Sequence, residues 1–315
     1  IFQLKDYDCP DFGTTSGSST SLSFLDGFAS TLRPQRDLII DAGANIGLFA
    51  IWISQLIHSQ QMRILSQRQT GDIGPFPIVA QMFQLLCIEP NPDAVAVLRR
   101  NMRRHAPETI IVQGALVGPS LATSAAGTEE ADFVVWPHLP GNSSLVEYEE
   151  ERSAQRKKAI LGGGGEEGQL DNRRAELLER LQEGRRKISV QTMTLTKLLE
   201  TMYFDSQERG ALSPESRIAL LKIDVEGGEM GVLKGLSFDH WQRIDRVVAE
   251  VHLRPNESLT EQAAFNKLLY EGLGENAIIK WCQPGWCRTN NNAASSTGSE
   301  QNQTPEADDD GNPLL

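Results

Sequence analysis

The sequence predicts an α/β fold in which a mostly parallel sheet carries helices on both faces. Apolar runs of strand length alternate with stretches of helical periodicity, which is the pattern of repeated strand–helix–strand units. A glycine-rich turn, residues 41–47, joins the first apolar run to the first helical stretch. Several apolar runs also end in a polar residue. Because the carboxyl ends of parallel strands share one edge of a sheet, the sequence predicts a ligand site there.

The turn after the first predicted strand, 37–41, carries the strongest local signal. Gly43 suits a tight turn with a positive φ, and Gly47 lets the following helix pack close to the strand. Asn45 stands where a dinucleotide-binding turn has a glycine that admits a pyrophosphate, so it favours a cofactor without phosphates, such as S-adenosylmethionine. In that interpretation Asp41 holds the amino group of the cofactor and amides of the turn meet its carboxylate. The alternative is a buried strand and a capped helix with no ligand.

The second predicted strand, 83–88, ends at Glu89. An acid at this position of a nucleoside-binding fold accepts hydrogen bonds from ribose hydroxyls. Asn91 followed by Pro92 predicts the N-cap and first position of the next helix. Glu89 is therefore a candidate ribose ligand, and a surface acid at a helix start is the alternative.

Further apolar runs supply the rest of the predicted fold. Strands are expected at residues 109–113, 133–136, 188–192, 218–224 and 247–252. Helices are expected at residues 45–57, 171–187, 195–203 and 258–270, the last closed by Gly272. No internal repeat is evident.

We expect one domain, residues 31–287, after a loose lead-in over 1–30 and before a disordered tail over 288–315. Two polar stretches, 58–83 and 146–187, are predicted insertions in this domain. The second contains four consecutive glycines. They lack the Gly-Lys-Ser/Thr ending of a phosphate-binding loop and follow no strand, so they predict a linker.

Residues 222–229 form the second informative block. On a strand, Lys222, Asp224 and Glu226 project to one side by the period of two. Asp224 falls at the strand end, where a bound ligand would lie. Glu229 opens the next helix, where an acid also favours the helix dipole, so a purely structural role is the alternative. For Lys222 the alternative is simple pairing with a neighbouring acid.

Glu250 and His252 are expected to share one side of the next strand. His252 is a natural general-base candidate because imidazole titrates near neutral pH, and Asp224 is the other candidate base. Glu250 completes the candidate catalytic group. A divalent ion held by Asp224 and Glu250 is an open option, but no metal site is predicted. A histidine that only lines the polar rim is the alternative.

Four segments together resemble the FkbM-type S-adenosylmethionine-dependent methyltransferases. They are residues 41–47, 89–92, 222–235 and 248–252. The order of these segments and of the strand ends matches the family pattern over roughly residues 37–255. The run 222–235 is the most family-specific segment. The resemblance implies a class I methyltransferase fold, which is Rossmann-like, with S-adenosylmethionine as cofactor. It also implies methyl transfer to a hydroxyl oxygen of a sugar, polyketide or similar small acceptor.

The resemblance places a Ser-rich segment, residues 142–145, near the active site. Residues 114–117, after the third strand, offer no acid to hold adenine, so Ala115 is expected to meet adenine through its backbone and packing. Two rival functions stay open. One is an NAD(P)-dependent oxidoreductase on the same architecture, which Asn45 disfavours. The other is a non-catalytic module that only binds S-adenosylmethionine.

The composition of the chain limits the classes of partner that it is expected to bind. The chain has 315 residues and a formal net charge of −12, which argues against a nucleic-acid partner. No segment reaches the roughly 18 apolar residues of a membrane span, so the expected partner is a small-molecule or glycan acceptor. Four cysteines make no disulfide framework at this length, although Cys282 and Cys287 are candidates for a bridge. The chain begins at Ile1, so we expect a processed or incomplete N-terminus, with a cytoplasmic location as the default expectation.

Overall fold

Within the described residues, the main sheet has five parallel strands in the order β3-β2-β1-β8-β9. Its strands are β1 (Asp37–Ala42), β2 (Phe83–Glu89), β3 (Ile110–Gln113), β8 (Arg217–Ile223) and β9 (Val247–Ala249). The central strand β1 is buried along its whole length, which explains its nearly continuous apolar sequence. The order runs outward from β1 in both directions, so the chain crosses over between β3 and β8. Such a switch point is where parallel α/β sheets bind ligands.

The computed structural model describes most of one unit of the chain, Leu25–Ile279. The described residues are 37–68, 83–122, 130–149, 153, 176–177, 179–209, 216–252, 258–274 and 277–279. The expected lead-in, the four-glycine run, the tail and the Cys282–Cys287 pair lie outside them. In the part that is described, no helix combines the length and apolar character that crossing a membrane requires.

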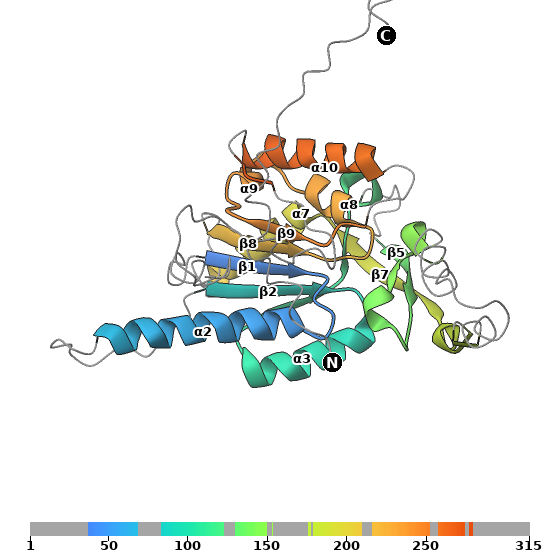
Figure 1. Ribbon diagram of the computed structural model, residues 1–315, viewed down its shortest axis with the longest axis horizontal. Coiled ribbons are helices and arrows are strands. Elements are labelled where there is room, and N and C mark those ends of the chain that lie inside the picture. The colour runs from blue at the N-terminus through green and yellow to red at the C-terminus, as the bar shows by residue number, and fades with distance from the viewer. Residues whose placement is uncertain are drawn as a thin grey trace, which may run out of the picture. The chain divides into compact units, whose positions relative to one another are not determined.

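Helices cover both faces of the main sheet, as the sequence predicts. They are α2 (Leu48–Arg68), α3 (Pro92–His105), α4 (Pro119–Ala122), α7 (Leu195–Arg209), α8 (Glu229–Lys234), α9 (Phe238–Trp241) and α10 (Ser258–Leu273). Figure 1 shows α2 and α3 together on one side of the strands, with α8, α9 and α10 on the other. The observed architecture is thus the expected α/β fold with a Rossmann-like parallel sheet.

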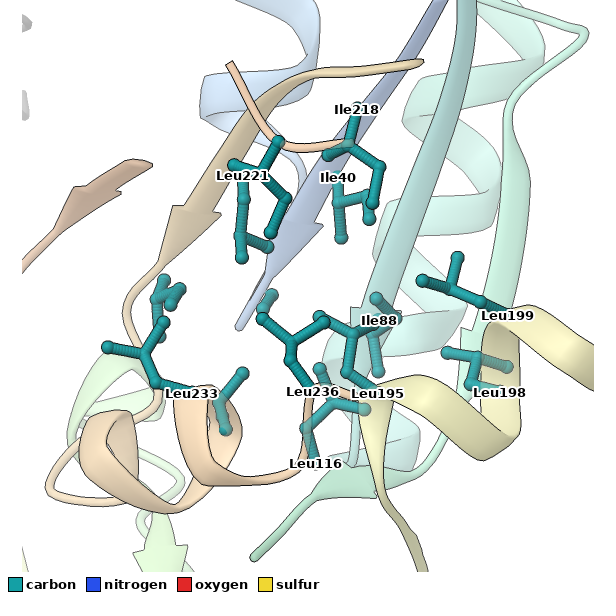
Figure 2. Close-up of a cluster of buried hydrophobic side chains, with 14 of the residues drawn as sticks. Ile40, Ile88, Leu116, Leu195, Leu198, Leu199, Ile218, Leu221, Leu233 and Leu236 are labelled. Atoms are coloured by element: carbon teal, nitrogen blue, oxygen red, sulfur yellow. The ribbon is translucent and has the colours of Figure 1, made fainter. Parts of the chain in front are cut away.

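One apolar cluster fills the space between the sheet and the α7–α10 side. Leu38 and Ile40 of β1 belong to it, and so do Leu195 of α7 and Leu233 of α8 (Figure 2). Because side chains alternate along a strand, Asp41 points to the opposite face, where α2 packs. The alternation therefore aims a charged side chain away from this cluster at the end of the strand.

A second, smaller sheet follows the order β4-β7-β5-β6. Its strands are β4 (Ala115–Leu116), β5 (Glu130–Val135), β6 (Ser144–Leu145) and β7 (Arg186–Met193), with a 3₁₀ turn η2 (Pro140–Asn142) before β6. Most of its pairing is antiparallel. Phe133, Val135 and Val190 form its own apolar core, whereas Leu116 belongs to the main cluster. The sequence predicted single strands here, not a separate sheet.

Several predicted boundaries are wrong. Helix α2 begins at Leu48, three positions later than expected, and continues to Arg68, so the predicted insertion 58–83 opens with helix. Its Gln- and Arg-rich sequence suggested a loop, but straight-chain polar residues have good helix propensity. Strand β7 begins before Ile188, so the helix expected over 171–187 ends earlier than predicted. Gly184, with φ +73°, makes that turn.

Helix α10 ends at Leu273, one residue beyond its predicted closing glycine. The residue with a positive φ after the helix is Gly274, at +92°, and its amide donates to the carbonyl of Tyr270. Gly272 has a different reason to be glycine. A Cβ there would lie 2.3 Å from the ring of Trp241, so Gly272 allows α10 to approach α9 closely.

Candidate functional site

The turn after β1 joins the ends of three strands. Gly43 has φ +79°, and its amide and that of Ala44 each donate to the carbonyl oxygen of Ile88 in β2, at 3.0 Å. A Cβ on Gly43 would lie 1.7 Å from the carbonyl oxygen of Asp224, which follows β8. The predicted positive φ of Gly43 is confirmed. The crowding adds a second reason why no side chain fits there.

Gly47 has φ +87° and packs against α3. A Cβ on it would lie 2.6 Å from Cδ1 of Leu98 and 2.8 Å from Cε of Met102. The side-chain amide of Asn101 in α3 donates to the carbonyl of Ile46 at 2.8 Å and fixes the same contact. The close approach that Gly47 permits is therefore to α3, whereas the sequence suggested an approach of the helix to its own strand.

Glu89 is held by two backbone amides. Its Oε2 accepts from the amide of Asn45 and its Oε1 from the amide of Asn91, both at 2.8 Å. Burial raises the pKa of Glu89 to about 7, against the opposing effect of these two hydrogen bonds. Asn91 also caps α3, as predicted, because its side chain accepts from the amide of Asp93. The carboxylate is thus fixed at the sheet edge before any ligand binds.

Asn45 adopts a left-handed backbone, with φ +49°, which asparagine tolerates better than most residues. Its Oδ1 is buried and has no hydrogen-bond donor. A Cβ on Gly141, in η2, would lie 3.4 Å from its Nδ2, so the turn before β6 lies against this side chain. The amides of Gly43, Ala44, Asn45 and Gly47 all donate within the protein. These four amides therefore already have partners within the protein, and the expectation that amides of the turn meet a cofactor carboxylate stays a prediction.

Lys222 bridges two acids beneath the turn. Its Nζ lies 3.2 Å from Oδ1 of Asp41 and 3.3 Å from Oδ2 of Asp224, and it donates to the carbonyl of Gly43 at 3.0 Å. Asp41 is fully buried, and burial raises its pKa while Lys222 lowers it. The side chain of Asp224 is 24% exposed. The pairing of Lys222 with neighbouring acids is thus present, and of the two acids Asp224 is open to a ligand.

The segment after β8 turns sharply. The strand ends at Ile223, and Glu226 and Gly227 both have positive φ, +58° and +110°. Glu226 therefore does not continue the strand, and its expected alignment with Lys222 and Asp224 is wrong. The side chain of Glu229 reaches back instead, and its Oε1 accepts from the amide of Gly227 at 2.9 Å.

His252 lies among three carboxylates. Its Nδ1 is 3.0 Å from Oε1 of Glu229, and its Nε2 is 3.7 Å from Oε2 of Glu226 and 3.6 Å from Oε1 of Glu250. Strand β9 ends at Ala249, so Glu250 and His252 stand in the following loop and not on the strand as expected. Glu250 and His252 are nonetheless close to each other, as expected. The amide of Glu250 still donates to the carbonyl of Ile223 and keeps the start of this loop beside β8.

The Ser-rich segment is anchored on the second sheet. Ser143 accepts from the amide of Trp136 at 3.0 Å, and the hydroxyl of Ser144 donates to Oε2 of Glu149, also at 3.0 Å. The indole of Trp136 donates to the other oxygen of Glu149, which is almost fully buried. Together with the contact between Gly141 and Asn45, these bonds bring the segment to the turn after β1.

Tyr148 lies against Gly227 and Gly228, a contact that the sequence did not suggest. A Cβ on Gly227 would lie 3.1 Å from Cβ of Tyr148, and one on Gly228 would lie 3.4 Å from its Cε2. Burial raises the pKa of this phenol, with Glu147 and Glu229 contributing. The two glycines after Glu226 therefore make room for an aromatic ring from the helical residues that follow β6.

The predicted site residues fall into two groups in the structure. The first group is the turn after β1 with Glu89, Asn91 and Asp224. Ala115 joins it through Gly114, whose amide donates to the carbonyl of Glu89 at 3.1 Å. The second group is His252 with Glu250, and the segment 224–229 leads from one group to the other. Across the described ranges, no set of three or more His, Cys, Asp or Glu side chains is arranged to hold a metal ion.

Known proteins are similar to this chain over most of its length. The sequence profile of the methyltransferase FkbM domain matches residues 41–272. The chain is 31% identical over 238 residues to methyltransferase sdnD of Sordaria araneosa, which covers 74% of this chain and 75% of that protein. It is 27% identical over 220 residues to methyltransferase 1 of Beauveria bassiana, with 69% and 66% covered. No solved structure matches the chain.

A bacterial relative extends the comparison. The chain is 29% identical over 225 residues to the 31-O-demethyl-FK506 methyltransferase FkbM of Streptomyces tacrolimicus, with 70% of this chain and 67% of that protein covered. The profile match begins at Asp41 and includes both groups of candidate site residues. The protein is therefore a methyltransferase, and it belongs to the FkbM family.

Proposed function

We propose that the protein transfers a methyl group from S-adenosylmethionine to a hydroxyl oxygen of a small-molecule or glycan acceptor. S-adenosylmethionine supplies a methyl carbon on a positively charged sulfur, and that sulfur leaves as a neutral thioether. The contribution of the protein is to align the acceptor with the cofactor and to remove the proton of the hydroxyl.

The observation that carries this proposal is a surplus of hydrogen-bond acceptors at the turn. Oδ1 of Asn45 is buried without a donor, and the carboxylate of Glu89 has lone pairs left after its two amides. The amino group and ribose hydroxyls of S-adenosylmethionine are donors. A pyrophosphate offers only acceptors and needs free backbone amides. Because a dinucleotide also carries ribose hydroxyls, it is the buried acceptor of Asn45, which suits an amino group, that favours S-adenosylmethionine over a dinucleotide.

The proposed cofactor site is built from Asp41, Gly43, Asn45, Gly47, Glu89, Asn91, Ala115 and Asp224. In this proposal Glu89 binds the ribose hydroxyls, and Asp224 with Asn45 receives the amino group. Asp41 acts through Lys222, which holds Asp224 in place. Ala115 meets adenine through packing and backbone groups. The glycines and Asn91 shape the turn and contribute no side-chain bond to the ligand.

Transfer to an alcohol requires a proton acceptor, and Asp224 and His252 are the candidates, with Glu250 beside His252. Methylation at oxygen is also supported by one relative, whose name describes a 31-O-demethyl acceptor. Acceptor pockets differ between proteins of one fold, so the proposal stays at the level of hydroxyl-bearing molecules.

Calorimetric titration with S-adenosylmethionine tests the cofactor. We expect the wild type to bind, and Glu89→Ala to weaken binding by about 10- to 100-fold, because hydrogen bonds to a charged group contribute about 1.5–3 kcal/mol. Glu271→Gln, which changes an exposed acid on α10, serves as the matched control and should leave affinity unchanged. Binding of NAD(P) without binding of S-adenosylmethionine would reverse the assignment in favour of an oxidoreductase.

Methyl transfer is tested with S-adenosylmethionine labelled in its methyl group against a panel of sugars and small alcohols. We expect label in an ether product of at least one acceptor. If S-adenosylmethionine binds but no acceptor takes the label, a non-catalytic binding module is the better description.

A further inference from the structure

Glu229 and His252 form a pair that the cofactor site does not use. Oε1 of Glu229 lies 3.0 Å from Nδ1 of His252, and the Glu229 side chain is 2% exposed. We propose that Glu229 is a positioning residue that fixes His252 as the general base of methyl transfer, with Nε2 as the atom that accepts the proton. This inference rests on the proposed function, and it names Glu229, a residue outside the predicted catalytic group.

Glu229 is itself held in place by the loop before it. The amide of Gly227 donates to the same Oε1 that faces His252, at 2.9 Å. Glu226 and Gly227 both have positive φ, a conformation that is unfavourable for a residue with a side chain such as Glu226. A strained backbone conformation of this kind persists only where contacts with the surrounding structure hold it in place. The carboxylate therefore has little freedom to turn away from the imidazole.

The position of this carboxylate selects the tautomer of His252. A bare Nδ1 lone pair facing a carboxylate is repelled, whereas an Nδ1–H donates a charge-assisted hydrogen bond. Neutral imidazole carries one proton, so a proton on Nδ1 leaves Nε2 as the basic atom. This is the arrangement by which an acid behind a histidine prepares the opposite nitrogen for proton transfer.

Nε2 faces two further carboxylates at distances longer than a hydrogen bond. Oε2 of Glu226 is at 3.7 Å and Oε1 of Glu250 at 3.6 Å, and the side chain of Glu250 is 63% exposed. Tyr148 is another titratable group near this cluster, through its interaction with Glu229. The three carboxylates stabilise the imidazolium that forms when Nε2 takes a proton. The exposed Glu250 gives that proton a route to water.

Asp224 is the less suitable base. Its carboxylate is held 3.3 Å from Lys222, whose Nζ also contacts Asp41 and the carbonyl of Gly43. This ion pair ties the Asp224 carboxylate to the turn after β1, where the cofactor would lie. His252 lies instead among the carboxylates of Glu226, Glu229 and Glu250. The placement of the two groups therefore favours cofactor binding by Asp224 and proton transfer by His252.

In the resulting step, Nε2 removes the hydroxyl proton as the oxygen forms its bond to the methyl carbon and the carbon–sulfur bond breaks. The products are the methyl ether, the neutral thioether and the imidazolium of His252. The imidazolium then releases its proton to water past Glu250. No oxidant, reductant or further reactant is needed.

Nitrogen-15 NMR of the histidine side chains tests the pair without any turnover. We expect the neutral ring of wild-type His252 to be the Nδ1–H tautomer, with its signal assigned by its loss in His252→Gln. Glu229→Gln should convert it to a mixture of tautomers, and Glu271→Gln should not. An Nε2–H tautomer in the wild type overturns the proposal, whether or not the protein binds S-adenosylmethionine.

Steady-state kinetics supply the second measurement. They use the labelled-methyl assay with an acceptor that the panel of sugars and alcohols has identified. We expect Glu229→Gln to lower kcat by about 100- to 10,000-fold with the KM for S-adenosylmethionine changed less than about threefold. The acid limb of the pH profile of kcat should move to lower pH, because an amide stabilises imidazolium less than a carboxylate does.

A double variant separates positioning from a general structural role. If Glu229 acts through His252, Glu229→Gln adds no further loss of kcat in a His252→Gln background. Equal losses in both backgrounds, or an unchanged kcat in Glu229→Gln, overturn the proposal. Failure of the proposed function looks different, since S-adenosylmethionine binding would then be absent from the wild type while the NMR result still reports on the pair.

Discussion

Glu89 changes its charge near neutral pH because burial raises its pKa to about 7 from an ordinary 4.5. The folded protein therefore holds this proton more tightly than the unfolded chain does. The contribution of Glu89 to the free energy of unfolding falls as pH rises from about 4.5 to about 7 and stays at its low value above that. Cofactor binding has the opposite dependence, because only the ionised carboxylate accepts hydrogen bonds on all its lone pairs.

We expect the affinity for S-adenosylmethionine to fall by up to about tenfold as pH is lowered from about 8 to about 6, because protonation of Glu89 weakens its bonds to the ribose hydroxyls. Calorimetric titrations over this pH range measure the effect. Glu89→Gln is the control. It should bind more weakly at high pH and show no such dependence, and an equal slope in this variant would assign the titration to another group.

The turn after β1 shows why an element can depend on a single glycine. Gly43 combines a positive φ with a Cβ position only 1.7 Å from the carbonyl oxygen of Asp224. Gly274 has a positive φ as well, but nothing lies within 4 Å of a Cβ placed there. The two positions therefore separate the cost of backbone conformation from the cost of crowding.

We expect Gly43→Ala to lower the free energy of unfolding by about 3 kcal/mol or more and to remove S-adenosylmethionine binding, since conformational strain and overpacking add. Gly274→Ala should cost only about 1–2 kcal/mol, from the left-handed conformation, and keep full affinity. Urea unfolding and calorimetry measure both. Similar losses in the two variants would show that crowding against Asp224 does not matter.

Element positions were predictable where one local rule decided them. The strand before Glu89 and the cap at Asn91 were both predicted, because apolar runs and N-caps are properties of a few adjacent residues. The end of α2 and the end of β9 at Ala249 were not. Both depend on which residues find partners in neighbouring elements, and a short sequence window does not contain those partners.

At the scale of the whole molecule, Leu116 joins the two sheets. It lies on β4 of the small sheet, yet its side chain packs with Ile88 of β2 and Leu195 of α7 in the main apolar cluster (Figure 2). The rest of the small sheet has its own core around Phe133 and Val190. The packing of Leu116 therefore couples the stability of the sheet that carries the Ser-rich segment to that of the main sheet.

We expect Leu116→Ala to lower the free energy of unfolding by about 2–5 kcal/mol, because it leaves a cavity where two cores meet. Leu259→Ala removes the same side chain from an exposed position on α10, 81% accessible, and should change stability by less than about 0.5 kcal/mol. Urea unfolding followed by circular dichroism gives both values. A loss below about 1 kcal/mol for Leu116→Ala would mean that the two sheets are stabilised independently.

The sequence by itself determined the parallel α/β fold, the family and the position of Glu89 at the end of β2. These follow from periodicity and from short runs such as 222–235, in which neighbouring residues carry the information. Only the tertiary structure decided which groups meet across the chain. The pairing of Glu229 with His252 joins the start of α8 to the loop after β9, and the amide of Asn45 reaches Glu89 from another strand end. Such pairings depend on sheet register and backbone φ, which arise when distant strands pack together.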